Sequence, residues 1–259
     1  MTKRLKSSMG WSSADRIVVR GLDLTKDVLG KVSLGDFAFL ELKGRLPTPQ
    51  ESVVFNALVV TLVEHGMTPS AIAARMTYFG APEALQAGVA AGILGMGDRF
   101  GGSIEQAARM LQEALSSQSR DADLRAIARQ VVADHRAAKR MIGGLGHPIH
   151  KPIDPRTPKL FAIAAENGLS GPYVNLMELI GEEATAAYGR ELPVNATGAI
   201  GAIASDLDFN WKICRGIAVM ARAIGLVGHL QEEMNEPAAA EIWSLVDEQT
   251  SSDSAPGQD

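Results

Sequence analysis

The sequence has little of several features that would place it in a special class of protein. Its 259 residues include one cysteine, Cys214, so no disulfide can form within the chain and a buried, inert thiol is expected. No apolar run approaches the ~20 residues that a membrane-spanning helix requires. The basic N-terminus leads into polar residues rather than the apolar core of a signal peptide. We therefore expect a cytoplasmic protein without a membrane segment.

The chain also lacks an excess of positive charge. Lysine and arginine number 25 against 30 acidic residues, which gives a net charge of −5 at pH 7. Binding to nucleic acid or to an anionic membrane needs a surplus of basic residues on the contacting face. Neither partner is expected. The 46% of hydrophobic residues and 21% of charged residues are instead typical of a globular protein with a large core.

What the sequence does contain is helical periodicity along most of its length. Only Arg16–Gly21 is β-branched enough to predict a short strand. Apolar residues recur at helical spacing in segments such as Gln50–Glu64 and Lys212–Met234, and Pro82–Met96 is so apolar that we expect it to be buried all round. The polar tail Thr250–Asp259 is predicted to be disordered. The fold class is therefore all-α with a minor N-terminal β element.

A loop rich in histidine and proline, Gly146–Arg156, stands between two of these helical patterns. It reads GHPIHKPIDPR and holds His147, His150, a lysine and an arginine within eleven residues. Glycine admits backbone conformations closed to other residues and proline fixes φ, so the loop has a defined shape. It is either a stiff surface connector with two incidental histidines or a site where charged side chains converge.

Three other features lie at predicted helix boundaries. His65 ends one helix, where the helix dipole favours an imidazolium cation. The glycine-rich turn Gly97–Gly102 joins two helices and offers backbone N–H groups to an anion. Asp206 ends a helix of small residues, where a buried carboxylate needs a partner. Each has a plain structural explanation when taken alone.

Several classes of chemistry lack their usual signatures. No HExxH-type helical pair and no cysteine near the histidines indicates a metal site, so no metal is expected. A nucleophile elbow and a glycine-rich nucleotide-binding fingerprint are also missing. The remaining interpretation is acid–base chemistry by imidazole and carboxylate, with arginines that hold anions.

Five segments together resemble motifs of the citrate synthase superfamily. They follow the family order at matching spacing: Arg20–Asp23 (RGLD), Glu41–Pro47 (ELKGRLP), Glu64–Ser70 (EHGMTPS), Gly146–Arg156 and Ala221–Gly225 (ARAIG). The resemblance is greatest to the short members, the citryl-CoA lyases and the lyase module of ATP-citrate lyase. It implies a multi-helical fold with two lobes and a homodimer. We expect one domain over residues 1–249, with a large lobe of about 1–115 and 209–249 and a small lobe of about 116–208.

The resemblance also implies roles for individual residues. It places His147 at the hydroxyl or carbonyl oxygen of the substrate, Asp206 at the proton of the acetyl carbon, and His65 on the oxaloacetate portion. Arg156 and Arg222 would hold substrate carboxylates in bidentate geometry that lysine could not reproduce. The resemblance also implies contacts between the coenzyme A thioester and Gly146 and Lys151. The basic helix before this loop adds Arg140, with Arg136 beside it.

Two positions depart from the pattern of the synthases. Phe100 occupies the place of a histidine that stabilises the enol oxygen in enzymes that condense acetyl-CoA, whereas the lyase modules share the sequence GDRFGG. Members of the family usually have another arginine about one helix after the position of Arg222. In this chain, the residue twenty positions beyond Arg222 is Ile242. Phe100, at the substrate, therefore favours cleavage over condensation.

We accordingly expect a citryl-CoA lyase-like enzyme that cleaves a 3-hydroxyacyl-CoA to acetyl-CoA and a 2-oxo acid such as oxaloacetate. One alternative is a citrate or 2-methylcitrate synthase-type acyltransferase that runs the condensation. Another is a CoA-thioester-binding subunit without chemistry of its own, which the missing distal arginine suggests.

Overall fold

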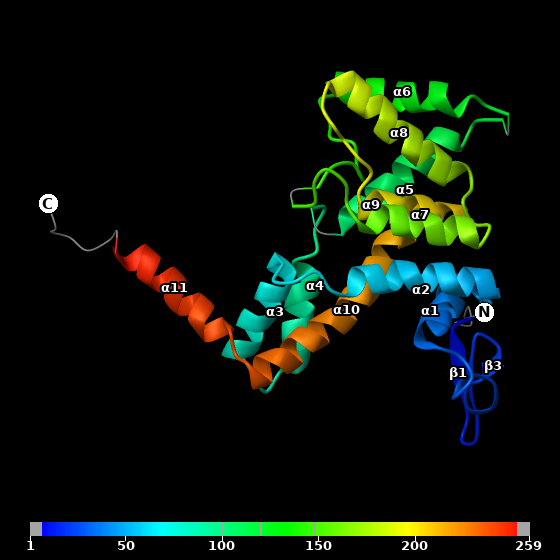
Figure 1. The fold of residues 1–259 in the computed structure, drawn as a ribbon. Coiled ribbons are helices and arrows are strands. Elements are labelled where there is room, and N and C mark those ends of the chain that lie inside the picture. Colours follow the sequence, from blue (N-terminus) through cyan, green and yellow to red (C-terminus); the bar gives the residue numbers. More distant parts are fainter. Residues whose placement is uncertain (1–6, 100, 120, 148, 253–259) are drawn as a thin grey trace, which may run out of the picture.

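The computed structural model describes residues 7–99, 101–119, 121–147 and 149–252. They form one small antiparallel sheet and a series of α-helices (Figure 1). The strands are β1 (Gly10–Ser12), β2 (Ile17–Val19) and β3 (Leu22–Asp23), followed by a π-helical turn, Leu24–Val28. The helices are α1 (Leu34–Lys43), α2 (Pro49–Val63), α3 (Pro69–Gly80), α4 (Leu85–Leu94), α5 (Gly102–Leu115), α6 (Leu124–Ala137), α7 (Arg156–Glu166), α8 (Pro172–Tyr188), α9 (Ala196–Asp206), α10 (Trp211–Asn235) and α11 (Ala239–Ser252). The predicted fold class is confirmed.

The 25-residue helix α10 runs from the region of α5 and α9 to the pair α3 and α4 (Figure 1). It packs against α2, α3, α4 and α5. By length and composition alone it could cross a membrane, but 44% of its most apolar window is buried inside the protein. Core packing therefore accounts for much of its apolar character. Cys214 lies on the buried face of α10, and burial raises the pKa of its thiol to about 12.

The main core lies where α9 packs against α5 and α8. Every residue of α9 from Ala196 to Ser205, apart from Thr197, is buried. Small residues permit this close packing: a Cβ on Gly201 would lie 2.9 Å from the carbonyl oxygen of Ile104. Helix α9 is consequently held in place along its whole length, which fixes the loop that precedes it.

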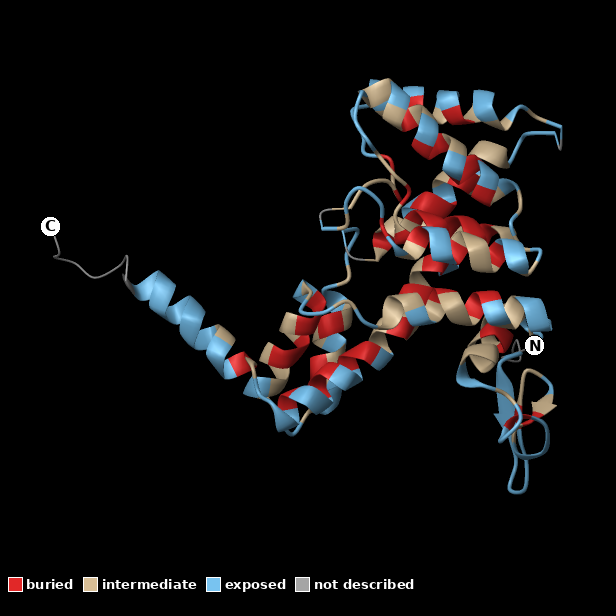
Figure 2. Cartoon of the chain, viewed as in Figure 1, coloured by how far each residue is buried: buried red, intermediate tan, exposed pale blue. Residues whose placement is uncertain are grey.

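Two local predictions were wrong. Helix α4 is not buried all round, because only Gly88 and Gly92 are buried and Leu94 is 86% exposed. The two glycines of α4 face α3 and α10, whereas its larger side chains are partly or fully exposed. The predicted disordered tail is helical as far as Ser252, since α11 continues through Thr250. Residues 253–259 lie outside the described part of the chain. Figures 1 and 2 show α11 projecting from the body of the protein with most of its surface exposed.

Candidate active site

The loop between α6 and α7 is bonded to the segment before α9. The backbone N–H of Gly146 donates to the Pro193 carbonyl at 2.8 Å, and the side-chain amide of Asn195 donates to the Gly146 carbonyl at 2.5 Å. Gly144 has a φ of +87°, and a Cβ there would lie 2.5 Å from the Cα of Gly198. A larger residue at position 144 would therefore push the loop away from α9. The loop is a fixed part of the fold rather than a free connector.

Asp154 anchors the other end of the same loop. Its carboxylate is 1% exposed and accepts two hydrogen bonds from the Arg156 guanidinium, at 2.9 and 2.8 Å. It also accepts the backbone N–H of Ala196 at 3.0 Å. Burial alone would raise the pKa of Asp154, but these hydrogen bonds outweigh it and hold the pKa at about 2. Asp154 is thus a permanent anion that orients Arg156, and it cannot serve as a base.

Three histidines meet beside this loop. His65, which follows α2, has its Nε2 atom 3.3 Å from Nε2 of His150. The rings of His147 and His150 are stacked, with centroids 4.4 Å apart and an angle of 27° between their planes. His65 and His147 are separated by 5.8 Å between centroids. The structure thus brings together the two predicted histidines, and it adds His150, which the motif comparison had not singled out.

Hydrogen bonds assign the proton on the ring of His147. Nδ1 of His147 accepts the backbone N–H groups of Ile149 and His150, at 3.2 and 3.0 Å. A neutral ring with Nδ1 as acceptor carries its proton on Nε2. Nε2 of His65 and Nε2 of His150 lie within hydrogen-bond distance, so one of these two nitrogens carries a proton and the other accepts it.

The surroundings keep two of these rings neutral. Burial lowers the pKa of His65, and the positive charge of Arg156 lowers it further. Burial and the neighbouring His150 do the same for His147. Neutral His147 presents an Nε2–H donor, which can hold a substrate oxygen but cannot take a proton from it. Contact between His147 and the substrate oxygen, the role that the resemblance implies, fits this tautomer.

The spacing of the three rings would also suit a metal ion, because one nitrogen from each lies within 4.8 Å of the others. Metal-binding histidines almost always donate the N–H of their second nitrogen to an acceptor. His147 does the opposite, since its second nitrogen accepts two N–H groups. The donor set therefore does not fit a three-histidine metal centre.

Two arginines give this cluster its positive charge. Arg156 stands at the start of α7, and Arg222 lies on α10 near enough to His65 to lower the pKa of that ring. Nη1 of Arg222 is buried and has no hydrogen-bond partner in the described part of the chain. A buried N–H group without a partner is costly, so this end of the guanidinium favours an acceptor such as a carboxylate oxygen. The pair can thus bind a dicarboxylate, in the positions that the sequence predicted for these residues.

Asp206 does not join the site. Its carboxylate accepts the backbone N–H groups of Gly171, Tyr173 and Val174, at 2.9, 3.1 and 3.0 Å. It therefore caps the start of α8. It stands at the far end of α9 from Ala196, which at 1.5 Å per residue puts it about 15 Å along the helix from the loop. Burial raises the pKa of Asp206 despite its three hydrogen bonds. The fold uses this carboxylate as a helix cap, and its proton transfer stays a prediction.

The glycine turn before α5 is also engaged within the fold. The N–H of Gly102 donates to the carbonyl of Gly97 at 3.2 Å, and Asp98 pairs with Arg215 at 2.7 Å. That N–H is consequently not available for an enolate. Phe100, predicted to contact the substrate, lies outside the described residues.

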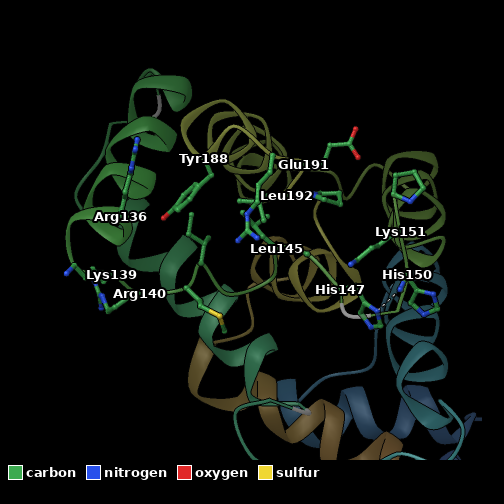
Figure 3. Close-up of a pocket in the computed structure, with 16 residues that line it drawn as sticks. Arg136, Lys139, Arg140, Leu145, His147, His150, Lys151, Tyr188, Glu191 and Leu192 are labelled. Atoms are coloured by element: carbon green, nitrogen blue, oxygen red, sulfur yellow. Dashed lines mark hydrogen bonds between the residues drawn. The ribbon is translucent and has the colours of Figure 1, made fainter.

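A cavity of about 990 Å³ opens beside the histidines. Figure 3 shows His147, His150 and Lys151 on one side of it and Arg136, Lys139 and Arg140 on the other. Gly146, Lys151 and Arg140, the three residues predicted to bind the cofactor, all line it. Lys139, Arg190 and Tyr188 also line it but were not predicted. Exposed basic residues at helix ends give no sequence signal that separates them from an ordinary solvated face.

Solved structures and named proteins resemble this chain. Citryl-CoA lyase from Hydrogenobacter thermophilus is 34% identical with a TM-score of 0.81, over 90% of this chain and 88% of that one. ATP citrate lyase from Methanothrix soehngenii, in complex with citrate and coenzyme A, has a TM-score of 0.77 at 22% identity and shares the fold over 91% of this chain and 39% of that one. A probable ATP-citrate synthase of Dictyostelium discoideum is 25% identical over 236 residues, which are 85% of this chain and 36% of that protein. The chain spans about a third of that relative.

Fold and site together define an all-α enzyme of the carbon–carbon lyase or acyltransferase class. More particularly, the chain belongs to the citrate synthase family, because the model of the citrate synthase C-terminal domain matches residues 21–243. The resemblance drawn from the sequence motifs is confirmed.

Proposed function

We propose that this protein is a citryl-CoA lyase-like enzyme that cleaves a 3-hydroxyacyl-CoA, such as citryl-CoA, to acetyl-CoA and a 2-oxo acid such as oxaloacetate. The observation that carries the proposal is a basic cavity lined by His147 and His150, whose neighbour His65 lies close to the charges of two arginines. This arrangement suits a substrate with phosphates at one end and carboxylates at the other. The 34% identity to a citryl-CoA lyase over most of both chains supports the same reaction.

The coenzyme A portion would occupy the cavity. Its phosphates would contact Arg140, Lys139 and Arg136 near the end of α6, and Lys151 would lie closer to the thioester. Phosphate oxygens form strong charge-assisted hydrogen bonds with such groups. The carboxylates of the oxo acid portion would then pair with Arg156 and Arg222.

The direct test is to incubate purified protein with citryl-CoA and measure acetyl-CoA and oxaloacetate. Formation of both products at equal rates, well above the rate without protein, is the expected result. No product above the uncatalysed rate would overturn the substrate assignment. Thiol release from acetyl-CoA plus oxaloacetate would instead assign a synthase, and coenzyme A binding without any turnover would assign a non-catalytic subunit.

We also propose that the protein is a homodimer. Large apolar side chains are exposed on three helices: Leu85 and Leu94 of α4, Ile224 and Val227 of α10, and Trp243, Leu245 and Val246 of α11. Apolar surface of this extent needs cover. A second copy of the chain would provide it symmetrically.

A further inference from the structure

The three histidines offer one common contact point. One nitrogen of each of His65, His147 and His150 lies within 4.8 Å of the other two. For any three atoms separated by no more than this distance, there is a position within about 2.8 Å of all three. A distance of about 2.8 Å is normal for a hydrogen bond to oxygen. A single oxygen atom can therefore contact all three rings at once.

The protonation pattern of the rings matches a hydroxyl group. Nε2 of His147 is a donor, and of the two contacting nitrogens, Nε2 of His65 and Nε2 of His150, one donates and the other accepts, so the cluster offers two donors and one acceptor. An alcohol oxygen has the complementary set, since it accepts two hydrogen bonds and donates one. A methylene group or a carbonyl oxygen at the same point would leave at least one ring without a partner.

From this geometry, and resting on the proposed function, we propose that His150 is a third catalytic histidine. Its Nε2–H, together with that of His147, binds the oxygen on carbon 3 of the substrate, while Nε2 of His65 takes the proton of that hydroxyl. The direct contact of 3.3 Å between His65 and His150 is the arrangement without substrate. The substrate hydroxyl enters between the two nitrogens and replaces that contact with two hydrogen bonds of its own.

The carboxylates near the cluster do not compete for this proton. Asp154 is bonded to Arg156 and to Ala196, and Asp206 caps α8. Glu64 accepts the backbone N–H of His65 at 2.8 Å, and its other oxygen lies 2.9 Å from Nε2 of His229. Among the described residues around the cluster, the imidazoles of His65 and His150 remain as the base, and we assign that role to His65.

The resulting step conserves atoms and charge. The O–H bond breaks and its proton moves to Nε2 of His65, while the oxygen forms the carbonyl double bond of the oxo acid. The bond between carbons 2 and 3 breaks, and its electron pair passes to the acyl-CoA fragment as an enolate. The imidazolium of His65 then returns one proton to the enolate carbon, which yields acetyl-CoA. Donors from His147 and His150 stabilise the negative charge that develops on the oxygen before the bond breaks.

Two substitutions separate a hydrogen-bond donor from a packing role. His150→Phe keeps a planar ring for stacking on His147 but has no donor. His150→Gln has a side-chain N–H₂ group close to the place of Nε2–H. We expect kcat for citryl-CoA cleavage to fall about 100-fold or more in His150→Phe, with KM changed less than about threefold, because loss of one oxyanion donor costs roughly 10²–10³ in rate. His150→Gln should stay within about tenfold of the unaltered enzyme.

The matched control is His135→Phe, which makes the same change in a histidine of α6 that does not line the cavity. Its kcat should remain unchanged. Thermal unfolding of all variants reports whether each protein is folded. The proposal is overturned if His150→Phe retains its rate within about threefold, or if the phenylalanine and glutamine variants are impaired equally, since the second result would show that the donor kept in the glutamine variant contributes nothing.

A binding measurement separates this proposal from the proposed function. The probes are a non-cleavable thioether analogue of citryl-CoA and its 3-deoxy counterpart, compared by calorimetry. The unaltered protein should bind the hydroxyl compound at least about tenfold more tightly, and His150→Phe should lose most of this preference. If citryl-CoA is not cleaved but this preference is present and depends on His150, the reaction assignment fails while the hydroxyl site stands. If neither analogue binds, or if the hydroxyl gives no preference, the assignment of His150 is wrong.

Discussion

The carboxylate of Asp154 accepts the backbone N–H of Ala196 at 3.0 Å, so the loop that carries His147 is tied to the first residue of α9. The same carboxylate holds the guanidinium of Arg156. One buried anion therefore sets the position of a substrate-binding arginine and of the histidine loop together.

Asp154→Asn is expected to lower stability in a pH-dependent manner. The pKa of Asp154 in the folded protein, about 2, lies below its ordinary value of 3.8. The ionised carboxylate therefore adds about 2 kcal/mol to the free energy of unfolding above pH ~4, and this contribution is lost as the pH falls towards 2. Urea unfolding at pH 7 and pH 2 should show a large difference between the variant and the unaltered protein only at pH 7. Asp121→Asn, on the exposed surface, should match the unaltered protein at both pH values. Equal loss at both pH values would contradict this account.

Asp206→Asn should affect folding rather than chemistry. The amide places an N–H₂ group against the start of α8, where the carboxylate now accepts three N–H groups. We expect stability to fall by about 1–3 kcal/mol, while kcat per folded molecule stays within about threefold. Denaturation and active-site-normalised kinetics measure the two effects. The neighbouring Asp208→Asn is the control, because that side chain is fully exposed. A 100-fold loss of kcat at unchanged stability would restore Asp206 as a proton-transfer residue.

Arg222→Met should make the free protein more stable and less able to bind substrate. Nη1 of Arg222 is buried without a partner, and burial lowers the pKa of the guanidinium. Replacing a buried charged group by an apolar chain of similar volume often stabilises by about 1–4 kcal/mol. The nearby carboxylate of Glu64 is half exposed and stays in contact with water. The temperature of thermal unfolding should be higher in the variant than in the unaltered protein. Added oxaloacetate should raise this temperature only in the unaltered protein. Arg215→Met, which removes an arginine of α10 that is paired with Asp98 and Glu105, should show no such gain. Protection of Arg222→Met by oxaloacetate would contradict the assignment.

Arg140→Glu should weaken coenzyme A binding. Hydrogen bonds to charged groups contribute about 1.5–3 kcal/mol, so loss of one corresponds to a tenfold or larger rise in Kd. The effect should shrink at high salt, because ions screen exposed charges. Calorimetry at two salt concentrations measures both. Arg109→Glu alters an exposed arginine of α5 that does not line the cavity and should leave Kd unchanged. Equal affinities of the Arg140 variant and the unaltered protein would remove the basic end of the cavity from the cofactor site.

Leu94→Glu should shift the proposed dimer towards monomer. Leu94 is 86% exposed in the single chain and belongs to the apolar group on α4, α10 and α11. Sedimentation should give twice the 27.5 kDa chain mass for the unaltered protein and the single mass for the variant at low concentration. Leu34→Glu, at a 71% exposed position on α1, is the control and should leave the mass unchanged. A monomeric unaltered protein would contradict the proposal.

The sequence by itself determined the helical fold and the residues that converge on the site. Helix boundaries could be predicted because their causes are local: Thr48 and Glu51 form a capping box at the start of α2, and Gly44 ends α1 with a φ of 73°. The histidine, arginine and proline content of the 146–156 loop marked it as a candidate before its contacts were known. Motif order then indicated the family.

Only the tertiary structure decided which titratable groups meet. Asp206 looked like a catalytic carboxylate, but the start of α8 supplies three N–H donors that claim it. His150 looked incidental in the sequence, but His65, which follows α2, places its Nε2 atom 3.3 Å from Nε2 of His150. Both partners come from segments remote in the chain, 32 to 35 residues away for Asp206 and 85 for His150. Local pattern cannot encode such contacts, because they depend on how whole helices pack.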